Sequence, residues 1–258
     1  MIKIDPVMTM FKYIPAALLG GFLLISCQQK PVVKEITCEQ IVINQAFDSL
    51  ANPELQAIVE SYKVQIDSVM NQQIGTASQT LAAGKPQSLL ANFTADILVQ
   101  AGREFTGKPV QFALMNNGGL RAPINAGVVT VGDVFKVFPF ENELVVLELE
   151  GDEVKELFKR VAAIGGEGLA GCELVTKNNK VESLLIGGKP VNDDATYWMA
   201  TIDYLADGNS GMSVLEEAEE RINTGVRLRD VMIQYIQQLT AQGKEVNAVF
   251  DNRIKVLP

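Results

Sequence analysis

Hydrophobic residues recur at spacings of three and four positions in five stretches of the chain. This spacing places them on one side of a helix, so each stretch is predicted to be amphipathic and helical. Ser88 and Thr130 are suited to cap two of these helices, because their hydroxyl groups can accept a hydrogen bond from a free backbone N–H. The predicted helices cover residues 53–73, 88–98, 130–138, 152–163 and 226–242. The first is expected to pack its apolar side on the domain that follows.

Short hydrophobic runs bounded by loop-forming residues predict strands between these helices. The runs cover residues 74–81, 110–115, 144–149, 173–176, 181–186, 197–202 and 253–257. The polar segment 177–180 joins two of them and is typical of a hairpin turn. Since strands and helices are mixed without strict alternation, the sequence predicts an α+β fold with mixed sheets packed with helices. No repeats or internal linkers occur after about residue 50, which favours one domain over residues 53–258.

The N-terminal residues carry a pattern typical of export. A basic region around Lys12 precedes a hydrophobic stretch, residues 14–25, that is too short to span a bilayer comfortably. The stretch ends Leu-Ile-Ser-Cys at Cys27, which resembles the lipobox of bacterial lipoproteins. Residues 1–26 are therefore predicted to be a signal peptide, Cys27 the lipidated residue and residues 27–52 a tether. This predicts a membrane-anchored lipoprotein of the bacterial cell envelope; the alternative is a transmembrane helix with an incidental cysteine.

Composition excludes several classes of function. The 258 residues include no histidine, which is the usual general base near neutral pH and the commonest metal ligand. Ser-His-Asp and Cys-His hydrolases, HExxH zinc enzymes and metallophosphatases with histidine ligands are therefore excluded for this chain. The formal net charge is −9, which repels a phosphate backbone, so no nucleic-acid partner is expected.

Two further features point to structure rather than to chemistry. Cys38 and Cys172 show no informative spacing, and both are expected to be free, partly buried thiols. Gly166-x-Gly168-x-x-Gly171 imitates a dinucleotide-binding fingerprint, which requires a preceding strand and a following helix. Here the predicted order is reversed, so these glycines are expected to form a mobile connection between helix and strand.

Two glycine-rich segments at predicted strand ends are candidates for ligand binding. Residues 116–121 read Asn-Asn-Gly-Gly-Leu-Arg; their glycines expose backbone N–H groups, and Arg121 offers a guanidinium suited to phosphate or carboxylate. Residues 203–212 open into a glycine-bearing loop with Tyr204 at its root. The residues alone leave structural alternatives open: a tight turn with a solvated arginine for the first segment, and a core aromatic for the second.

Five blocks, in this order, resemble the C-terminal domain of the 5′-nucleotidase and UDP-sugar hydrolase family. They are residues 116–121, 132–135, 138–144, 149–151 and the Asp-Tyr-Leu-Ala-x-Gly loop at 203–208. The resemblance extends from about Ile74 to Leu257 and implies the fold of that domain, which in the family binds the nucleoside and positions the phosphate. The family's metallophosphatase domain, which holds two metals, has no counterpart here. Divalent metals are therefore expected only in a partner protein, and no cofactor is expected in this chain.

The resemblance also implies which residues bind substrate. Phe140 and Tyr204 fall on the two positions whose rings sandwich the base, and Asn142 falls on an asparagine near it. Asn116 and Arg121 match the polar pair that orients the substrate. The predicted substrate-binding set is Asn116, Gly118, Gly119, Arg121, Phe140, Asn142, Tyr204 and Ser210, with no catalytic or metal-binding residue.

Two departures from the family pattern leave a second function open. Ser210 stands where the family has an aspartate that holds the ribose, and Lys85-Pro86 stands where it has a phosphate-contacting arginine. The first hypothesis is a nucleoside- or nucleotide-binding domain that acts with a separate metallophosphatase in nucleotide dephosphorylation and is not catalytic alone. The alternative is an interaction or scaffold protein of the envelope that has lost the ligand site. A self-sufficient hydrolase using Asp and Glu alone is disfavoured, because no paired-carboxylate constellation is evident.

Overall fold

The computed structural model describes residues 38, 40–42, 44 and 52–258. Cys27, the predicted signal peptide and most of the predicted tether lie outside the described residues. Residues Glu54–Pro258 pack as one unit and hold nearly all of the regular structure. In the described part of the chain, no helix combines the length and the apolar composition needed to cross a bilayer.

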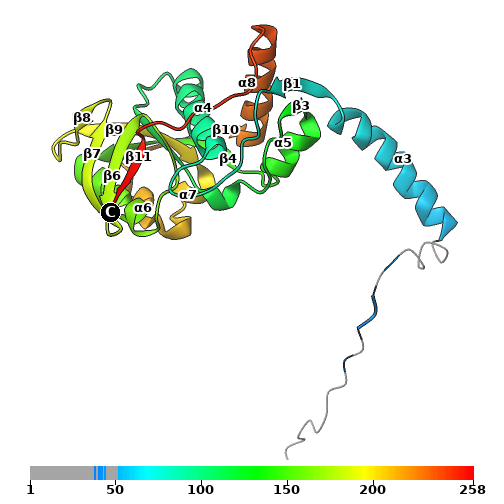
Figure 1. The fold of residues 1–258 in the computed structure, drawn as a ribbon, viewed down its shortest axis with the longest axis horizontal. Helices are drawn as coiled ribbons and strands as arrows, with labels where there is room; N and C mark the ends of the chain where they lie inside the picture. Colours follow the sequence, from blue (N-terminus) through cyan, green and yellow to red (C-terminus); the bar gives the residue numbers. More distant parts are fainter. Residues whose placement is uncertain (1–37, 39, 43, 45–51) are drawn as a thin grey trace, which may run out of the picture. The chain divides into compact units, whose positions relative to one another are not determined.

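A five-stranded mixed sheet forms the centre of the domain (Figure 1). In spatial order its strands are β10 (Glu220–Arg227), β4 (Glu143–Glu150), β9 (Thr196–Ile202), β2 (Phe112–Met115) and β5 (Gly168–Ala170). β2 runs parallel to β9, whereas the other neighbouring strands pair antiparallel. The C-terminal ends of β2 and β9 therefore meet at the same edge of the sheet, beside the start of β4.

Helices α4 (Leu89–Thr106) and α6 (Gly151–Ala163) cover opposite faces of this sheet. A Cβ atom on Gly102 of α4 would lie 3.0 Å from Ala200 and 3.2 Å from Val146, so glycine permits the close approach. Phe158 of α6 packs on Phe112 of β2 with ring centroids 5.7 Å apart. Ala200 is in register with the residue after Phe112. Because successive side chains of a strand point to opposite faces, the two helices bury the sheet from both sides.

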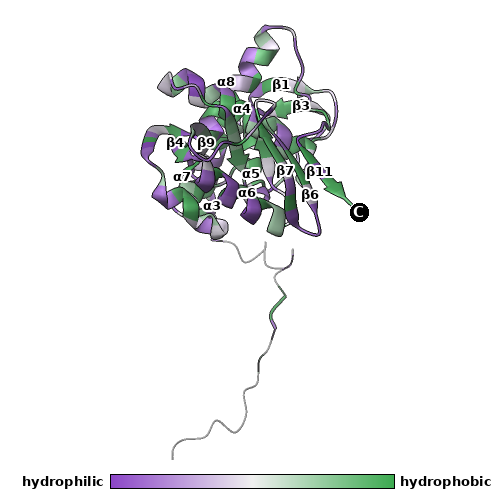
Figure 2. Cartoon of the chain, turned by 90° about the vertical axis from the view of Figure 1, so that its left-hand side faces the viewer, coloured by the Kyte–Doolittle hydropathy of each residue, from purple (hydrophilic) through white to green (hydrophobic). Residues whose placement is uncertain are grey.

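Two smaller sheets complete the domain. β11 (Ile254–Leu257), β6 (Cys172–Lys177), β7 (Lys180–Ile186) and β8 (Lys189–Pro190) form one, and β1 (Gln73–Ala77) and β3 (Gly127–Thr130) form the other. The remaining helices are α3 (Pro53–Met70), α5 (Val131–Val137), α7 (Asp203–Ala206) and α8 (Leu228–Ala241). Figure 2 shows the hydrophobic colour concentrated in the strands and the hydrophilic colour in the outer loops. This is the distribution expected when burial of apolar surface drives folding.

The predicted α+β fold with mixed sheets is confirmed, and so are its main local signals. Ser88 accepts a backbone hydrogen bond at the start of α4. Thr130 and Asp133 form a reciprocal capping box at the start of α5. Between β6 and β7 the chain turns through Asn178 and Asn179, whose φ values of 51° and 58° suit a tight hairpin.

Four strands, β3, β5, β8 and β10, were not predicted. Residues 220–227 form β10, and the last long helix begins only at Leu228. β10 is an edge strand with no fully buried residue, so it lacks the hydrophobic run on which the prediction depended. The glycine-rich connection predicted to be mobile contains β5, which is buried and pairs with β2. A Cβ atom on Gly166 would lie 2.2 Å from the carbonyl oxygen of Pro86, so this glycine allows a close backbone approach.

Helix α3 differs most from its prediction. Its apolar side was expected to pack on the domain, but none of its residues is buried and only Met70 is partly covered. The prediction of packing is therefore wrong. The chain leaves the helix at Asn71 and enters β1, which pairs with β3. This pairing holds the last turn of α3 against Gly132 and brings no other element over the rest of the helix.

Candidate functional site

All eight residues predicted to bind substrate line one cavity of about 300 Å³. They come from three loops that are far apart in the sequence: one after β2, one before β4 and one after β9. The start of β4 is in register with the end of β9, where Leu144 pairs with Ile202. The Thr201 hydroxyl donates to the Leu114 carbonyl oxygen at 2.9 Å and ties β9 to the end of β2. Strand order and direction therefore bring the three loops together.

The loop after β2 is a single turn of 3₁₀ helix, Asn117–Gly119. A Cβ atom on Gly119 would lie 2.7 Å from Met115 and 3.0 Å from Oδ1 of Asn116, so only glycine fits without displacement. Asn116 is buried, and among the described residues its Oδ1 has no hydrogen-bond partner. A buried amide oxygen without a partner costs free energy. It is therefore available to a donor on a ligand in the cavity.

Glu167 stabilises this turn through two hydrogen bonds to Asn117. The sequence did not predict this role for Glu167. Its Oε2 accepts hydrogen bonds from the backbone N–H of Asn117 at 2.5 Å and from Nδ2 of Asn117 at 2.8 Å. Its side chain is almost fully buried, and Lys85 Nζ lies 3.9 Å from its other oxygen. Lys85 also donates to the Ile164 carbonyl oxygen and does not line the cavity. Lys85 thus lies beside Glu167, outside the cavity.

Two aromatic side chains are exposed in the cavity wall. Phe140 is 50% and Tyr204 is 41% exposed, and both line the site. The sequence alone left open a core position for Tyr204, and the structure excludes it. Exposed aromatic rings beside a cavity are typical of ligand sites, because burial within the fold does not account for them.

Glu141 fixes the loop that carries Phe140 and Asn142. Its carboxylate pairs with Arg227 Nε at 2.5 Å and with Arg229 Nη2 at 2.6 Å. Arg229 is buried, and its guanidinium lies over the Phe135 ring, 3.9 Å from the centroid. The hydrogen bond from Arg229 is the main reason why the pKa of Glu141 lies below its ordinary value of 4.5.

The position of Glu141 between two predicted binding residues is the sequence signal that marks it as part of the site. This signal does not identify its partner. Glu141 stands between Phe140 and Asn142, two residues predicted to bind the ligand. An acidic residue inside a binding loop needs a positive partner if the loop is to be held in place. The partner, Arg229, is 88 positions away in the sequence and could not be assigned without the fold.

Arg121 and Ser210 are two further polar residues that line the cavity. The Arg121 side chain is exposed, and the one hydrogen bond that it forms with the described residues runs from Nη1 to the Gly118 carbonyl oxygen at 3.3 Å. Ser210 has a φ of 58°, in the left-handed region that non-glycine residues seldom adopt. A Cβ atom on Gly211 would lie 2.6 Å from the Arg160 guanidinium, so the backbone beside Ser210 packs tightly. Arg121 can therefore reorient toward a ligand, while Ser210 is exposed and has a left-handed backbone conformation.

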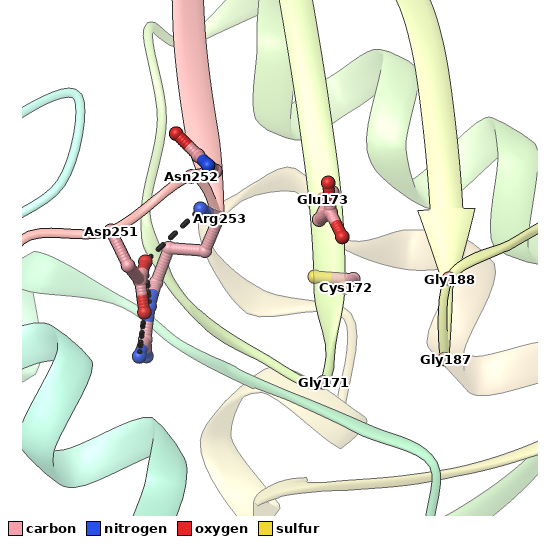
Figure 3. A pocket seen from close by; sticks show the side chains of 8 residues that line it. All are labelled: Gly171, Cys172, Glu173, Gly187, Gly188, Asp251, Asn252 and Arg253. Carbon is pink, nitrogen blue, oxygen red and sulfur yellow. Dashed lines mark hydrogen bonds and ion pairs between the residues drawn. The ribbon is translucent and has the colours of Figure 1, made fainter.

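A second cavity of about 430 Å³ lies at the ends of β6 and β11 (Figure 3). Figure 3 shows Asp251 and Arg253 joined to each other on one side of it, with Cys172 on the neighbouring strand. The remaining hydrogen bonds of Arg253 go to Asp96 and to two backbone carbonyl oxygens. Burial raises the pKa of the Cys172 thiol to about 12, which keeps it protonated and unreactive. The groups around this cavity thus serve the fold.

Cys38 and Cys172, the cysteines among the described residues, differ in exposure. Both have free thiols, as predicted, but only Cys172 is buried. Cys38 is exposed, so the prediction of partial burial is wrong for it. No group of three acidic or cysteine side chains within the described residues is arranged to hold a metal ion.

A model of the family described as the 5′-nucleotidase C-terminal domain matches residues 73–217. The chain belongs to this family. The match covers β1 through the 3₁₀ turn at Ser213–Glu217 and includes all eight residues of the cavity. The predicted family resemblance is thereby confirmed for the domain itself.

Similar proteins contain this domain within longer chains. The trifunctional nucleotide phosphoesterase protein YfkN of Bacillus subtilis is 29% identical over 225 residues, which is 79% of this chain and 15% of that protein. Protein UshA of Yersinia enterocolitica is 28% identical over 220 residues, 83% of this chain and 39% of UshA. The chain therefore spans well under half the length of these relatives.

Solved structures of the family share the fold. The 5′-nucleotidase precursor of Thermus thermophilus superposes with a TM-score of 0.69 at 28% identity, covering 78% of this chain and 43% of that one. The NAD nucleotidase of Haemophilus influenzae superposes with a TM-score of 0.60 at 20% identity, covering 80% and 41%. The α+β arrangement of mixed sheets and helices is thus that of the 5′-nucleotidase C-terminal domain.

Proposed function

We propose that this chain binds a nucleoside or nucleotide and presents its phosphate to a separate metallophosphatase, which hydrolyses it. The observation that carries the proposal is the cavity whose lining combines two exposed aromatic rings with an arginine and buried polar groups. Family membership supports a nucleotide-type substrate, since relatives bear names such as nucleotide phosphoesterase and 5′-nucleotidase.

Each part of such a ligand has a suitable counterpart in the cavity. The rings of Phe140 and Tyr204 offer faces on which a base can stack. The free Oδ1 of Asn116 can accept a hydrogen bond from a hydroxyl or amino group, and Ser210 can bind a ribose hydroxyl. The Arg121 side chain is exposed and can change its conformation. Its guanidinium can therefore bind a phosphate at the entrance of the cavity.

Hydrolysis is assigned to a partner because this chain has no histidine and offers mainly stacking and hydrogen-bonding groups at its site. Metallophosphatase chemistry needs two metals that clamp the attacking and leaving oxygens. In our proposal the partner supplies these divalent metals, and this chain supplies recognition and orientation. Both proteins act at the bacterial envelope, to which Cys27 anchors this chain.

A scaffold function without a ligand is the second candidate, and Ser210 is the observation that favours it. A hydroxyl is a weaker acceptor than the carboxylate of the family pattern, and Lys85 contacts Glu167 instead of the cavity. In this case the fold would serve contacts with other envelope proteins. The two functions differ in one measurable property, the binding of nucleosides.

The purified full chain is expected to bind adenosine monophosphate and to release no phosphate from it. Calorimetric titration measures binding, and a phosphate assay with manganese, zinc or magnesium measures turnover against a heat-treated control. Metal-dependent turnover that copurifies with the chain would contradict the division of labour with a partner. Absence of binding, with the fold intact by circular dichroism, would favour the scaffold function.

Replacement of Cys27 by serine is expected to release the protein from membranes. Acyl chains on Cys27 would hold it there, because each buried methylene contributes about 0.8 kcal/mol and two or more chains anchor stably. Cell fractionation and immunoblotting of both forms measure the change, with Cys38→Ser as the matched control. Equal soluble amounts of the Cys27→Ser form and the unaltered protein would rule out a lipid anchor at this position.

A further inference from the structure

Helix α3 (Figure 1) presents an apolar side that no described part of the domain covers. Val59, Tyr62, Ile66 and Val69 each have between 53% and 64% of their surface exposed. A surface helix normally turns such a side toward a core. An uncovered apolar side of this length is typical of a surface that contacts another molecule.

The spacing of these residues identifies the kind of surface. Starting at Leu55, the apolar positions alternate in steps of four and three through Val59, Tyr62, Ile66 and Val69. This is the heptad repeat of a coiled coil, in which one helix packs along another. Val59 and Ile66 take the a positions, and Leu55, Tyr62 and Val69 take the d positions. The side of α3 therefore suits another helix with the same repeat.

Charges along α3 permit a second copy to be that helix. Glu60 and Asp67 lie at b positions, away from the apolar side, so two copies would not bring them together. Lys63 lies at an e position, where a parallel second copy places Ile58 opposite it. An antiparallel pair centred on Tyr62 would instead bring the two lysines together. Electrostatics therefore favour a parallel pair.

The area available is sufficient for a weak specific interface. Burying the exposed parts of the five heptad side chains in both copies removes on the order of 1,000 Å² from water, about the lower limit for such an interface. We propose that two copies of this chain associate through α3 as a parallel two-stranded coiled coil. The helix has 18 residues and is about 27 Å long, so the association is weak and depends on concentration.

Disulfide crosslinking of the full chain tests this pairing, in a Cys38→Ser background that removes the exposed thiol found among the described residues. Ile66→Cys places a thiol between the two helices, where the Cα atoms of the copies approach closely. Val64→Cys places a thiol at an f position on the outer side of the same helix. Under mild oxidation, Ile66→Cys is expected to yield about ten times more linked dimer than Val64→Cys.

A charge in the interface gives a second, matched comparison. Val59→Glu in the Ile66→Cys protein is expected to abolish the linked dimer, whereas Val64→Glu is expected to leave it unchanged. Val59 and Val64 are 63% and 61% exposed in the single chain, so neither change disturbs the fold, which thermal unfolding checks. Equal crosslinking at both cysteine positions, no crosslinking at either, or insensitivity to Val59→Glu would overturn the proposal. A product joining Ile66→Cys to a different protein would overturn it too.

Discussion

Alanine in place of Phe140 or Tyr204 is expected to weaken the binding of adenosine and of its monophosphate by about one to two powers of ten. Each stacking contact between a base and an aromatic ring contributes about 1–3 kcal/mol by alanine substitution. Both rings are half exposed and line the cavity, so their loss removes a contact with the ligand and little packing within the fold. Titration calorimetry of the three proteins measures the change.

Two further variants make this experiment specific to the site. Phe105→Ala removes an aromatic ring that is 42% exposed but lies on α4, outside the cavity, and should leave binding unchanged. Arg121→Ala should weaken the monophosphate more than adenosine, because in the proposed function its guanidinium would pair with the phosphate. If Phe140→Ala and Phe105→Ala bind alike, the aromatic cavity is not where the base lies.

Addition of this chain to a single-domain metallophosphatase from the same genome is expected to raise kcat/KM for adenosine monophosphate. The phosphate would reach the metals of the partner while the base stays in the cavity of this chain, so each protein supplies what the other lacks. The expected rise is about tenfold or more, since positioning a bound substrate commonly contributes several kcal/mol. Initial rates at increasing concentrations of this chain measure it.

The Phe140→Ala form is the control for this effect, and the rate increase should fall with it to the level of the phosphatase alone. A form altered outside the cavity, Phe105→Ala, should retain the full increase. An unchanged rate at saturating concentrations of both proteins would exclude this pair. An increase that survives Phe140→Ala would show that the two proteins interact without use of the cavity.

The residues that line the cavity could be predicted from the sequence, but the residues that hold them could not. The paired glycines, Arg121 and Tyr204 belong to two local patterns in the sequence, whereas Phe140, Asn142 and Ser210 were predicted through the resemblance to the family. Glu141 and Glu167 act through Arg229 and Asn117, which are 88 and 50 positions away. Such partners become visible only when the strand order brings distant loops together.

The same distinction explains the errors in the fold. Strands β4 and β9 carry continuous apolar runs because both of their faces are buried, and they were predicted. β10 pairs with β4 at the edge; most of its side chains are polar, and its apolar residues Ile222 and Val226 are only partly buried. For α3 the pattern identified the helix correctly, but periodicity records only that one side is apolar and does not record which molecule covers it.

The left-handed backbone at Ser210 has a consequence for how ligand preference can evolve. Asparagine and aspartate adopt this conformation more readily than other residues with a side chain. Gly208 and Gly211, both at positive φ, belong to the same loop, and the Arg160 guanidinium lies beside Gly211. A carboxylate could therefore enter this position without remodelling of the loop. If the cavity binds a nucleoside as proposed, the strength with which the sugar hydroxyl is held would depend on this one side chain.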